Sequence, residues 1–482
     1  MNRKMIFFTF GRILQTEGAL LLLPTFVSLG YGEMKAFVAL LVTAIASALA
    51  GTVITALAHT ENKLIYAREG FAITALAWIG MSLVGALPFV ISGEVSSYVD
   101  AFFETVSGFT TTGASCLKNY TELSHGIQFW RCFTHWIGGM GVLVFVMAIV
   151  SNMSDRSIHI MRAEMPGPVI GKLVPKAKDT AKILYGIYIA LTVFEILFLW
   201  KFGQSGGMNL YEATIHSLST AGTGGFGSRA DSIASYSSYC KIVITVFMLL
   251  FGVNFNLYFL MLIRRFKAVF QSTELRFYIG LIVVFTLVIT ANIYSMVGTF
   301  GKSLEDAAFQ VAAFITTTGY TTTNPNLFPG LAKGLLLLLM FFGSCAGSTA
   351  GGLKLSRVLL LIKMIGREMK KLLHPRAVTS VNFEGKDVDS STLSSVATYF
   401  AVYALCIIAT FLLVCFEPFG FETNFTAAVS AFNNIGPIFG TKADFCDYSI
   451  FSKLVFSLSM MLGRLEIFPI VIALSPSTWL KK

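Results

Sequence analysis

The sequence predicts an all-α polytopic membrane protein, and three observations support this fold class. First, 55% of the 482 residues are hydrophobic and only 13% are charged, whereas a soluble domain has about 45–50% apolar and about 25% charged residues. Second, the mean hydropathy is +0.71. Third, the chain contains about ten apolar segments that could cross a bilayer, which takes roughly 20 residues each.

These predicted spans follow one another along the whole chain. The first has a basic start, as a signal peptide does, but its apolar region is too long and is interrupted by Arg12 and Glu17, so we expect it to be retained. The full set is 5–30, 36–58, 71–91, 131–151, 183–202, 240–263, 277–299, 333–362, 396–416 and 452–474.

The distribution of basic residues predicts the orientation. An even number of spans puts both termini on one side, and the basic loops at 152–182, 264–276 and 363–387 lie on that side. The positive-inside rule makes it cytoplasmic. We therefore interpret the net charge of +10 as an orientation signal in contact with membrane lipid, and not as a surface for nucleic acid.

Four shorter apolar pieces lie between spans on the other side, at 100–109, 210–219, 305–315 and 424–432. Each has about half the length needed to cross, and each runs into a short polar stretch with glycine. The unit of span, half-helix, polar glycine segment and span is thus repeated four times, and such repeats dominate the interpretation of a sequence. The expected organisation is a helix pair at 1–59 followed by pore repeats at 60–182, 183–276, 277–387 and 388–482.

The polar glycine segments predict a selectivity filter. Irregular backbone inside a bilayer is tolerated only where it is buried in protein or lines water, and extended segments around one axis can present carbonyl oxygens that replace the hydration shell of a cation. Alternatively, each segment only ends a helix, but this does not explain four copies in the same place. The predicted cation-binding residues are Thr110, Thr111, Thr112, Gly113, Ala221, Gly222, Thr223, Gly224, Thr316, Thr317, Thr318, Gly319, Asn433, Asn434, Ile435 and Gly436.

Two features lie elsewhere in the predicted spans. Residues 342–354 are rich in small residues, and Gly343, Gly347, Gly351 and Gly352 weaken a helix there; either the span is broken by a loop, or the small residues pack against another helix. Arg464 lies within the last span, where a cation costs about 2.5–3.5 kcal/mol on insertion scales. It therefore faces either a cavity or a partner such as Glu195.

The four glycine segments, the arrangement of spans and half-helices, and the stretch Met461–Pro469 (MLGRLEIFP) together resemble the Trk/Ktr/HKT superfamily of potassium transporters. The resemblance covers nearly the whole chain and is strongest to the bacterial TrkH-type uptake subunits. The second segment departs most from the Thr-rich form, because Gly222 and Gly225 flank Gly224 and leave its register open.

This resemblance implies several further properties. The transported ion would be K⁺, and Gly113, Gly224, Gly319 and Gly436 would be linked to its passage. The loop at 342–354 would act as a gate, with Arg464 beside the path. The protein would be a homodimer in the bacterial inner membrane, with one pore per protomer and a cytoplasmic nucleotide-binding regulatory ring of the TrkA type as partner.

Two other functions remain to be compared with this one. A channel-like subunit of a potassium-pumping ATPase complex would share the filter, although the loop at 342–354 and the basic loops favour the Trk type. An intramembrane enzyme would need converging titratable groups, but the six His are spread over loops and span ends. We find no spacing typical of a nucleophile and base or of metal ligands, and we expect neither enzymatic activity nor an organic cofactor.

Overall fold

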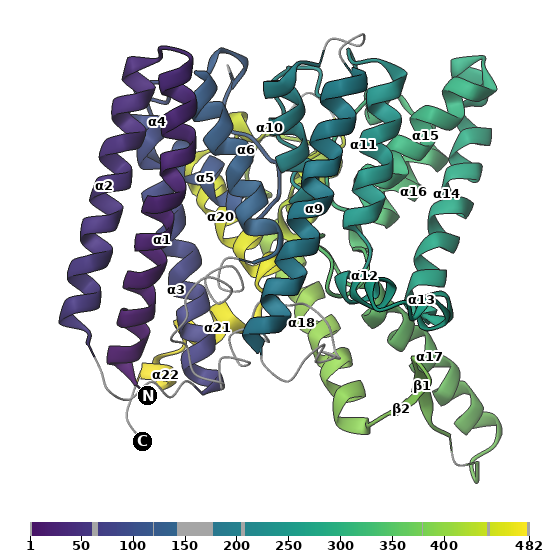
Figure 1. The fold of residues 1–482 in the computed structure, drawn as a ribbon. Helices are drawn as coiled ribbons and strands as arrows, with labels where there is room; N and C mark the ends of the chain where they lie inside the picture. Colours follow the sequence, from purple (N-terminus) through teal and green to yellow (C-terminus); the bar gives the residue numbers. More distant parts are fainter. Residues whose placement is uncertain are drawn as a thin grey trace.

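The computed structural model describes residues 2–59, 66–118, 120–141, 177–203, 208–377, 379–440 and 444–479, and their regular structure is almost entirely helical (Figure 1). The helices are α1 (Arg3–Gly30), α2 (Met34–Leu57), α3 (Ala67–Gly85), α4 (Leu87–Ile91), α5 (Tyr98–Phe109), α6 (His125–Gly139), α9 (Ala177–Gly203), α10 (Leu210–Ala221), α11 (Ser238–Phe251), α12 (Phe255–Leu262), α13 (Phe266–Gln271), α14 (Thr273–Val297), α15 (Phe300–Ile315), α16 (Gly330–Phe341), α17 (Leu355–Leu373), α18 (Ser390–Val414), α19 (Phe421–Asn433), α20 (Ile450–Arg464), α21 (Phe468–Leu474) and α22 (Pro476–Trp479).

Helices α1 and α2 form an antiparallel pair at one side of the molecule (Figure 1). Two glycines allow their backbones to touch. A Cβ on Gly11 would lie 2.7 Å from the carbonyl oxygen of Gly51, and a Cβ on Gly51 would lie 2.5 Å from that of Gly11. Small residues at such a contact let membrane helices approach closely, which fixes this pair beside α3 and α6.

Six of the predicted spans are long apolar helical stretches in the described part of the chain. They are α1, α2, α3 with α4, α9, α14 and α18, and each has the length and composition needed to cross a membrane. The chain is therefore a polytopic membrane protein, as its composition predicts.

The other four predicted spans are not continuous helices in the described residues, and three of them differ in this from expectation. The sequence predicted a break only at 342–354, where α16 and α17 are indeed separated. The span at 240–263 is also broken, since α11 and α12 meet at 90°, and the span at 452–474 is broken because α20 and α21 meet at 119°. In the span at 131–151, α6 ends at Gly139, and residues 142–151 lie outside the described part.

The two unexpected bends have local causes. Gly252 and Asn254 separate α11 from α12, and the Asn254 side chain caps the second helix by accepting a bond from the Asn256 N–H. At the other bend Glu466 and Ile467 have φ of 56° and 65°. These left-handed conformations end a helix, and Pro469 stands in the first turn of the next one, where proline is tolerated.

The four predicted half-helices are present as α5, α10, α15 and α19, and their carboxyl-terminal halves are buried in the interior. Two of them have side-chain caps at their amino ends: Ser97 accepts a bond from the Asp100 N–H, and Asn209 accepts one from the Glu212 N–H. Such caps satisfy backbone donors that a half-helix inside a bilayer could not give to water.

A small antiparallel hairpin of β1 (Val381–Phe383) and β2 (Lys386–Val388) follows α17. Glu384 and Gly385 form its two-residue turn with φ of 50° and 74°, the conformation that hairpin turns prefer. The hairpin packs through Val381 and Phe383 onto Leu360 and Leu393 of α17 and α18. It lies at the end of the molecule that also carries both termini (Figure 1).

Candidate functional site

The backbone follows the same path at the end of each half-helix. The first residue past the final turn is left-handed: Thr111, Thr223, Thr317 and Asn434 have φ between 55° and 57°. In a non-glycine residue this conformation costs about 1–3 kcal/mol. Two residues further on, a glycine with positive φ occurs in each copy: Gly113, Gly225, Gly319 and Gly436.

Backbone hydrogen bonds stabilise this conformation in the same way each time. The N–H of the residue after the left-handed one donates back five residues: Thr112 to Ser107 O (2.8 Å), Gly224 to Ser219 O (2.9 Å), Thr318 to Ala313 O (2.9 Å) and Ile435 to Ser430 O (3.0 Å). Such bonds close the last helical turn as in a Schellman motif. We call the four stretches 110–113, 222–225, 316–319 and 433–436 the ring segments.

Close contacts join the ring segments into a closed circle. A Cβ on Gly113 would lie 1.9 Å from Gly224 O, one on Gly225 would lie 2.0 Å from Thr318 O, and one on Gly319 would lie 1.8 Å from Ile435 O. A Cβ on Gly436 would lie 2.8 Å from Thr112 O, which returns to the first segment. Each glycine therefore makes room for a carbonyl of the next segment, so four backbones surround one axis.

This geometry corrects the predicted register of the second segment. Gly225, and not Gly224, has the positive φ and the ring contact of Gly113, Gly319 and Gly436. Ala221 is the last residue of α10 and lies one position before the segment. Sequence spacing alone missed this because Gly224 is also a glycine for a packing reason: its Cβ would lie 2.2 Å from Nδ1 of His135.

Threonine side chains brace the first and third segments. Thr110 Oγ1 and Thr112 Oγ1 are 2.8 Å apart, as are those of Thr316 and Thr318. Thr110 and Thr316 also donate to carbonyls of their own half-helices. In the fourth segment Asn434 Nδ2 donates to Thr112 Oγ1 at 3.0 Å and so ties this segment to the first. The hydroxyls thus hold the segments while their carbonyls stay available.

A wide cavity of about 1390 Å³ opens on one side of the ring. It is lined by all four ring glycines, by Asp231, Asp444 and Asp447, and by Lys118, which pairs with Asp447 at 3.4 Å. Three carboxylates and one ammonium group give this lining a net negative charge. A cavity that carries acidic side chains raises the local concentration of cations. This side of the ring can therefore collect hydrated cations.

The loop 342–354, which is not helical, also packs against the ring. The Gly351 N–H donates to Thr317 Oγ1 at 2.7 Å, and a Cβ on Gly351 would lie 2.6 Å from Asn433 O. The loop therefore lies directly against the third and fourth ring segments. The alternative prediction for these small residues is that they pack against another helix. It is wrong, because Gly343, Gly347 and Gly351 lie between α16 and α17 and not in a helix.

Hydrogen bonds hold the loop in place. Gly343 N–H donates to Leu353 O at 2.8 Å across the base of the loop. The Glu274 carboxylate of α14 accepts bonds from the backbone N–H groups of Ala346 (2.8 Å) and Ser356 (3.0 Å). Glu274 was not predicted as a site residue. The feature of the sequence that could have indicated it is an acidic residue in the first turn of an apolar helix.

Arg464 lies beside this loop at the end of α20. Its guanidinium donates to Thr349 O (2.7 Å) and to Gly138 O and Gly139 O (2.6 Å each), so it joins the loop to the end of α6. A cavity of only about 30 Å³ lies between these groups, room for about two water molecules. Glu466 pairs with Arg357 at 2.6 Å, in line with the expectation that residues two apart on a helix do not face each other.

The fold and the ring define a class of protein: a polytopic helical membrane protein in which four half-helices end in segments that surround one axis. Comparison with known families makes this specific. The family model of the TrkH cation transport proteins matches residues 36–481, so this chain belongs to that family.

Named relatives agree with this assignment. The chain is 37% identical over 471 residues to the Trk system potassium uptake protein TrkH of Salmonella typhimurium, covering 95% of both chains, and 38% identical over 429 residues to that of Escherichia coli, covering 87% of both. The crystal structure of the potassium transporter TrkH from Vibrio parahaemolyticus superposes with a TM-score of 0.89 at 31% identity, over 99% of this chain and 100% of that one. These relatives are named as transport proteins and not as enzymes.

Proposed function

We propose that this chain carries K⁺ across the bacterial inner membrane through a gated, channel-like pore in which the ring segments form the selectivity filter. The observation that carries the proposal is the closed circle of glycine and carbonyl contacts, from Gly113 through Gly225 and Gly319 to Gly436. Carbonyl oxygens around an axis can replace the hydration shell of a cation. The names of the relatives, as potassium uptake proteins, support K⁺ as the cation.

The surroundings of the ring fit inward movement of a cation. The wide cavity with Asp231, Asp444 and Asp447 would face the outside and concentrate cations before they enter the ring. A membrane potential then drives the ion inward with about 2.3 kcal/mol per charge for each 100 mV. Uptake through such a path needs no reaction in this chain.

The loop 342–354 and Arg464 are the proposed gate. The loop lies against Thr317 and Asn433, and the cavity that it lines together with Arg464 has a volume of only about 30 Å³. Opening would require the loop to leave the ring and Arg464 to release Thr349.

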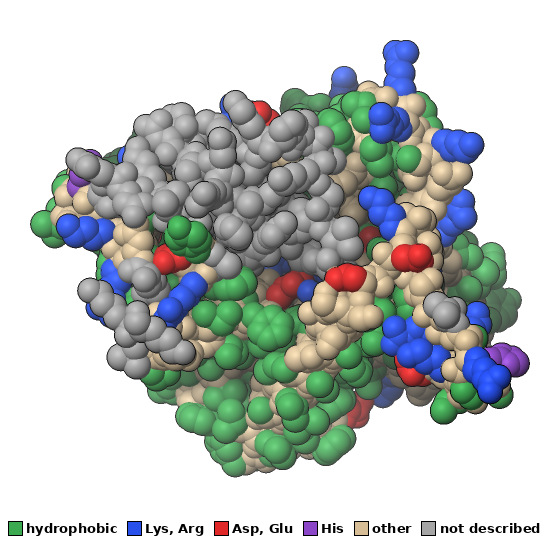
Figure 2. Space-filling view, turned by 90° about the horizontal axis from the view of Figure 1, so that it is seen from below, with side chains coloured by type: hydrophobic (Ala, Val, Ile, Leu, Met, Phe, Trp, Pro, Cys, Tyr) green, Lys and Arg blue, Asp and Glu red, His purple; other side chains and the backbone are tan. Residues whose placement is uncertain are grey.

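The proposed orientation places both termini in the cytoplasm. Viewed from that end, Lys and Arg side chains gather on the side of α13, α17 and the hairpin (Figure 2). The exposed basic residues there are Arg264, Arg265, Lys267, Arg276, Lys370, Lys371, Arg376 and Lys386. We infer that a nucleotide-binding regulatory ring of the TrkA type docks on this end of a homodimer. The basic loop predicted at 152–182 lies mostly outside the described residues.

Purified protein in liposomes tests the function. We expect potassium-loaded proteoliposomes to take up labelled rubidium, with weak competition by Na⁺ and without added ATP. Flux that requires a pump ATPase would instead favour the channel-like subunit of a pumping complex. No rubidium flux from a folded, inserted chain in the presence of a regulatory partner would disprove the proposal.

A further inference from the structure

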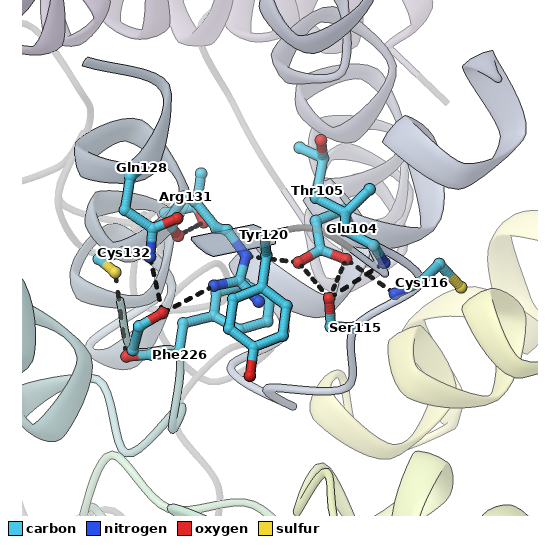
Figure 3. Close-up of polar contacts among 12 residues, drawn as sticks. Glu104, Thr105, Ser115, Cys116, Tyr120, Gln128, Arg131, Cys132 and Phe226 are labelled. Carbon is cyan, nitrogen blue, oxygen red and sulfur yellow. Dashed lines mark hydrogen bonds and ion pairs between the residues drawn. The ribbon is translucent and has the colours of Figure 1, made fainter. Parts of the chain in front are cut away.

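A buried ion pair joins Glu104 and Arg131, which lie outside the ring segments (Figure 3). Glu104 is in the half-helix α5, and Arg131 is in α6; Arg131 Nε donates to Glu104 Oε1 at 2.5 Å, and the side chains are 2% and 0% exposed for Arg131 and Glu104 respectively. Burying two charges is costly unless additional hydrogen bonds satisfy them. Both residues have such bonds, and these reach the residues that directly follow two different ring segments.

Glu104 holds the chain that leaves the first ring segment. Its carboxylate accepts bonds from Ser115 Oγ at 3.0 and 3.1 Å and from the Cys116 N–H at 3.0 Å. These residues come directly after Gly113 and Ala114. The carboxylate therefore fixes where the first segment ends, relative to its own half-helix.

Arg131 reaches the chain that leaves the second ring segment. Its Nη1 donates to Gly227 O at 3.3 Å, and its guanidinium lies 3.6 Å from the centre of the Phe226 ring. Gln128, one turn earlier on α6, donates to the same Gly227 carbonyl at 2.7 Å. Phe226 and Gly227 follow Gly225, so the guanidinium fixes the end of the second segment.

The pair thus connects the first and second ring segments, which contact each other where Gly113 meets Gly224 O. The other three half-helices have no carboxylate at the position of Glu104, which lies nine residues before the ring glycine. His216 stands there in α10 between the hydroxyls of Tyr236 (3.2 Å) and Tyr320 (3.3 Å). Gln310 and Ala427 stand there in α15 and α19. A charged link therefore occurs at this position in only one of the four repeats.

We propose that Glu104 and Arg131 act as positioning residues that set the spacing of the first and second ring segments and thereby the discrimination of K⁺ from Na⁺. This inference rests on the proposed function. A carbonyl ring favours one cation only while its oxygens keep their separation. The hydroxyls of Thr110 and Thr112 brace each other within one segment, whereas Glu104 and Arg131 connect one segment to the next.

Two conservative variants test the link. Glu104→Gln keeps an acceptor for Ser115 and Cys116 but removes the charge that faces Arg131. Arg131→Lys keeps a cation beside Glu104 but lacks the planar fork that also reaches Gly227. We expect each variant to lower the K⁺/Na⁺ permeability ratio by about tenfold, the change that follows when roughly one charged hydrogen bond no longer favours the K⁺-sized ring.

The permeability ratio is measured from reversal potentials in planar bilayers, alongside thermal stability in detergent. Lys302→Gln, which breaks a half-exposed ion pair with Glu305 and Asp306 at the start of α15, is the matched control and should keep the wild-type ratio. A purely structural role would lower stability and total flux in the Glu104 and Arg131 variants but leave the ratio unchanged. An unchanged ratio in either variant, once folded and inserted, overturns the proposal.

A milder variant keeps the test decisive if both of these fail to fold. Ser115→Ala removes two contacts to Glu104 while leaving the ion pair intact, and we expect it to lower the ratio about two- to threefold. A wild-type ratio in Ser115→Ala overturns the proposal as well. If wild-type protein itself shows no potassium flux, the proposed function has failed, and not this inference alone.

Discussion

At the scale of single residues, glycine is required at the ring positions for two reasons: the lack of space for a Cβ and the positive φ. A side chain at Gly113, Gly225 or Gly319 would place its Cβ within 2.0 Å of a carbonyl oxygen of the neighbouring segment. Real Cβ atoms do not approach so closely, so the neighbouring carbonyl must move. The positive φ adds to this cost for any residue with a Cβ.

We therefore expect Gly113→Ser and Gly225→Ser each to reduce the K⁺/Na⁺ permeability ratio by about tenfold or more, because a displaced carbonyl oxygen changes the distances at which the ring coordinates a cation. Reversal potentials in bilayers measure this. Gly280→Ser is the control, because nothing lies within 4 Å of a Cβ at Gly280. A wild-type ratio in Gly113→Ser would show that the first segment is not part of the filter.

Arg464 carries a positive charge and also holds the loop 342–354 to the end of α6 by hydrogen bonds. Two substitutions separate these roles. Arg464→Ala removes both the charge and the bonds to Thr349, Gly138 and Gly139, so we expect cation flux to rise severalfold. Arg464→Lys keeps the charge but cannot donate to three carbonyls in the same geometry, and it should give an intermediate flux. Rubidium uptake measures both, and a lower flux in a folded Arg464→Ala variant would favour a structural role.

At the scale of elements, the half-helices were predictable and the bends were not. The half-helices are visible because an apolar run of about ten residues followed by Thr and Gly cannot be a span. The bend after α20 depends on the left-handed Glu466 and Ile467, residues that carry no turn preference. Their conformation is stabilised by tertiary contacts such as the ion pair between Glu466 and Arg357, which no local pattern reveals.

The same distinction applies to the candidate site. In three of the four segments the ring glycine lies at the expected position, since Gly113 and Gly319 each follow three threonines and Gly436 is the single glycine of its segment. The second segment contains Gly222, Gly224 and Gly225, so the ring position could be assigned only from backbone angles and contacts with neighbouring segments. The link between Glu104 and Arg131 joins residues from two helices that are 27 positions apart in the chain, and no local spacing pattern indicates such a pair.

At the scale of elements, the loop 342–354 is expected to limit the leak of cations through the ring. Deleting Ala346–Gly351 removes the bond from Gly351 to Thr317 and the contact with Asn433, and should raise the leak of rubidium in the absence of any partner. Replacing the same six residues by alternating Ser and Gly keeps the length and should raise the leak less. Unchanged flux in a folded, inserted deletion variant would count against a gate at this place.

At the scale of the whole molecule, the exposed charges separate the two ends. The end with the termini carries the basic residues of α13, α17 and the hairpin (Figure 2), whereas the wide cavity at the other end has Asp231, Asp444 and Asp447. Basic loops favour the cytoplasmic side, and acidic side chains attract cations on the other. Both observations lead to the same proposed orientation.

The basic end is mechanically connected to the proposed gate. The hairpin packs on Leu360 of α17 and Leu393 of α18 through Val381 and Phe383, and α17 begins at Leu355, directly after the loop 342–354. Movement of the hairpin would therefore be transmitted along α17 to the loop. A partner shifts this equilibrium only if it binds the closed and open states with different affinity.

We expect the basic end to be the docking surface of the regulatory ring. Changing Lys370, Lys371, Arg376 and Lys386 to Gln removes four exposed positive charges, and should weaken binding of the ring about tenfold or more at physiological salt because these charges steer and hold an acidic partner. Nucleotide-dependent flux should be lost while basal flux remains. Changing Lys35 and Lys201, which lie exposed at the other end, is the control and should alter neither. Co-purification of the ring with the quadruple variant, with its nucleotide response intact, would show that docking takes place elsewhere.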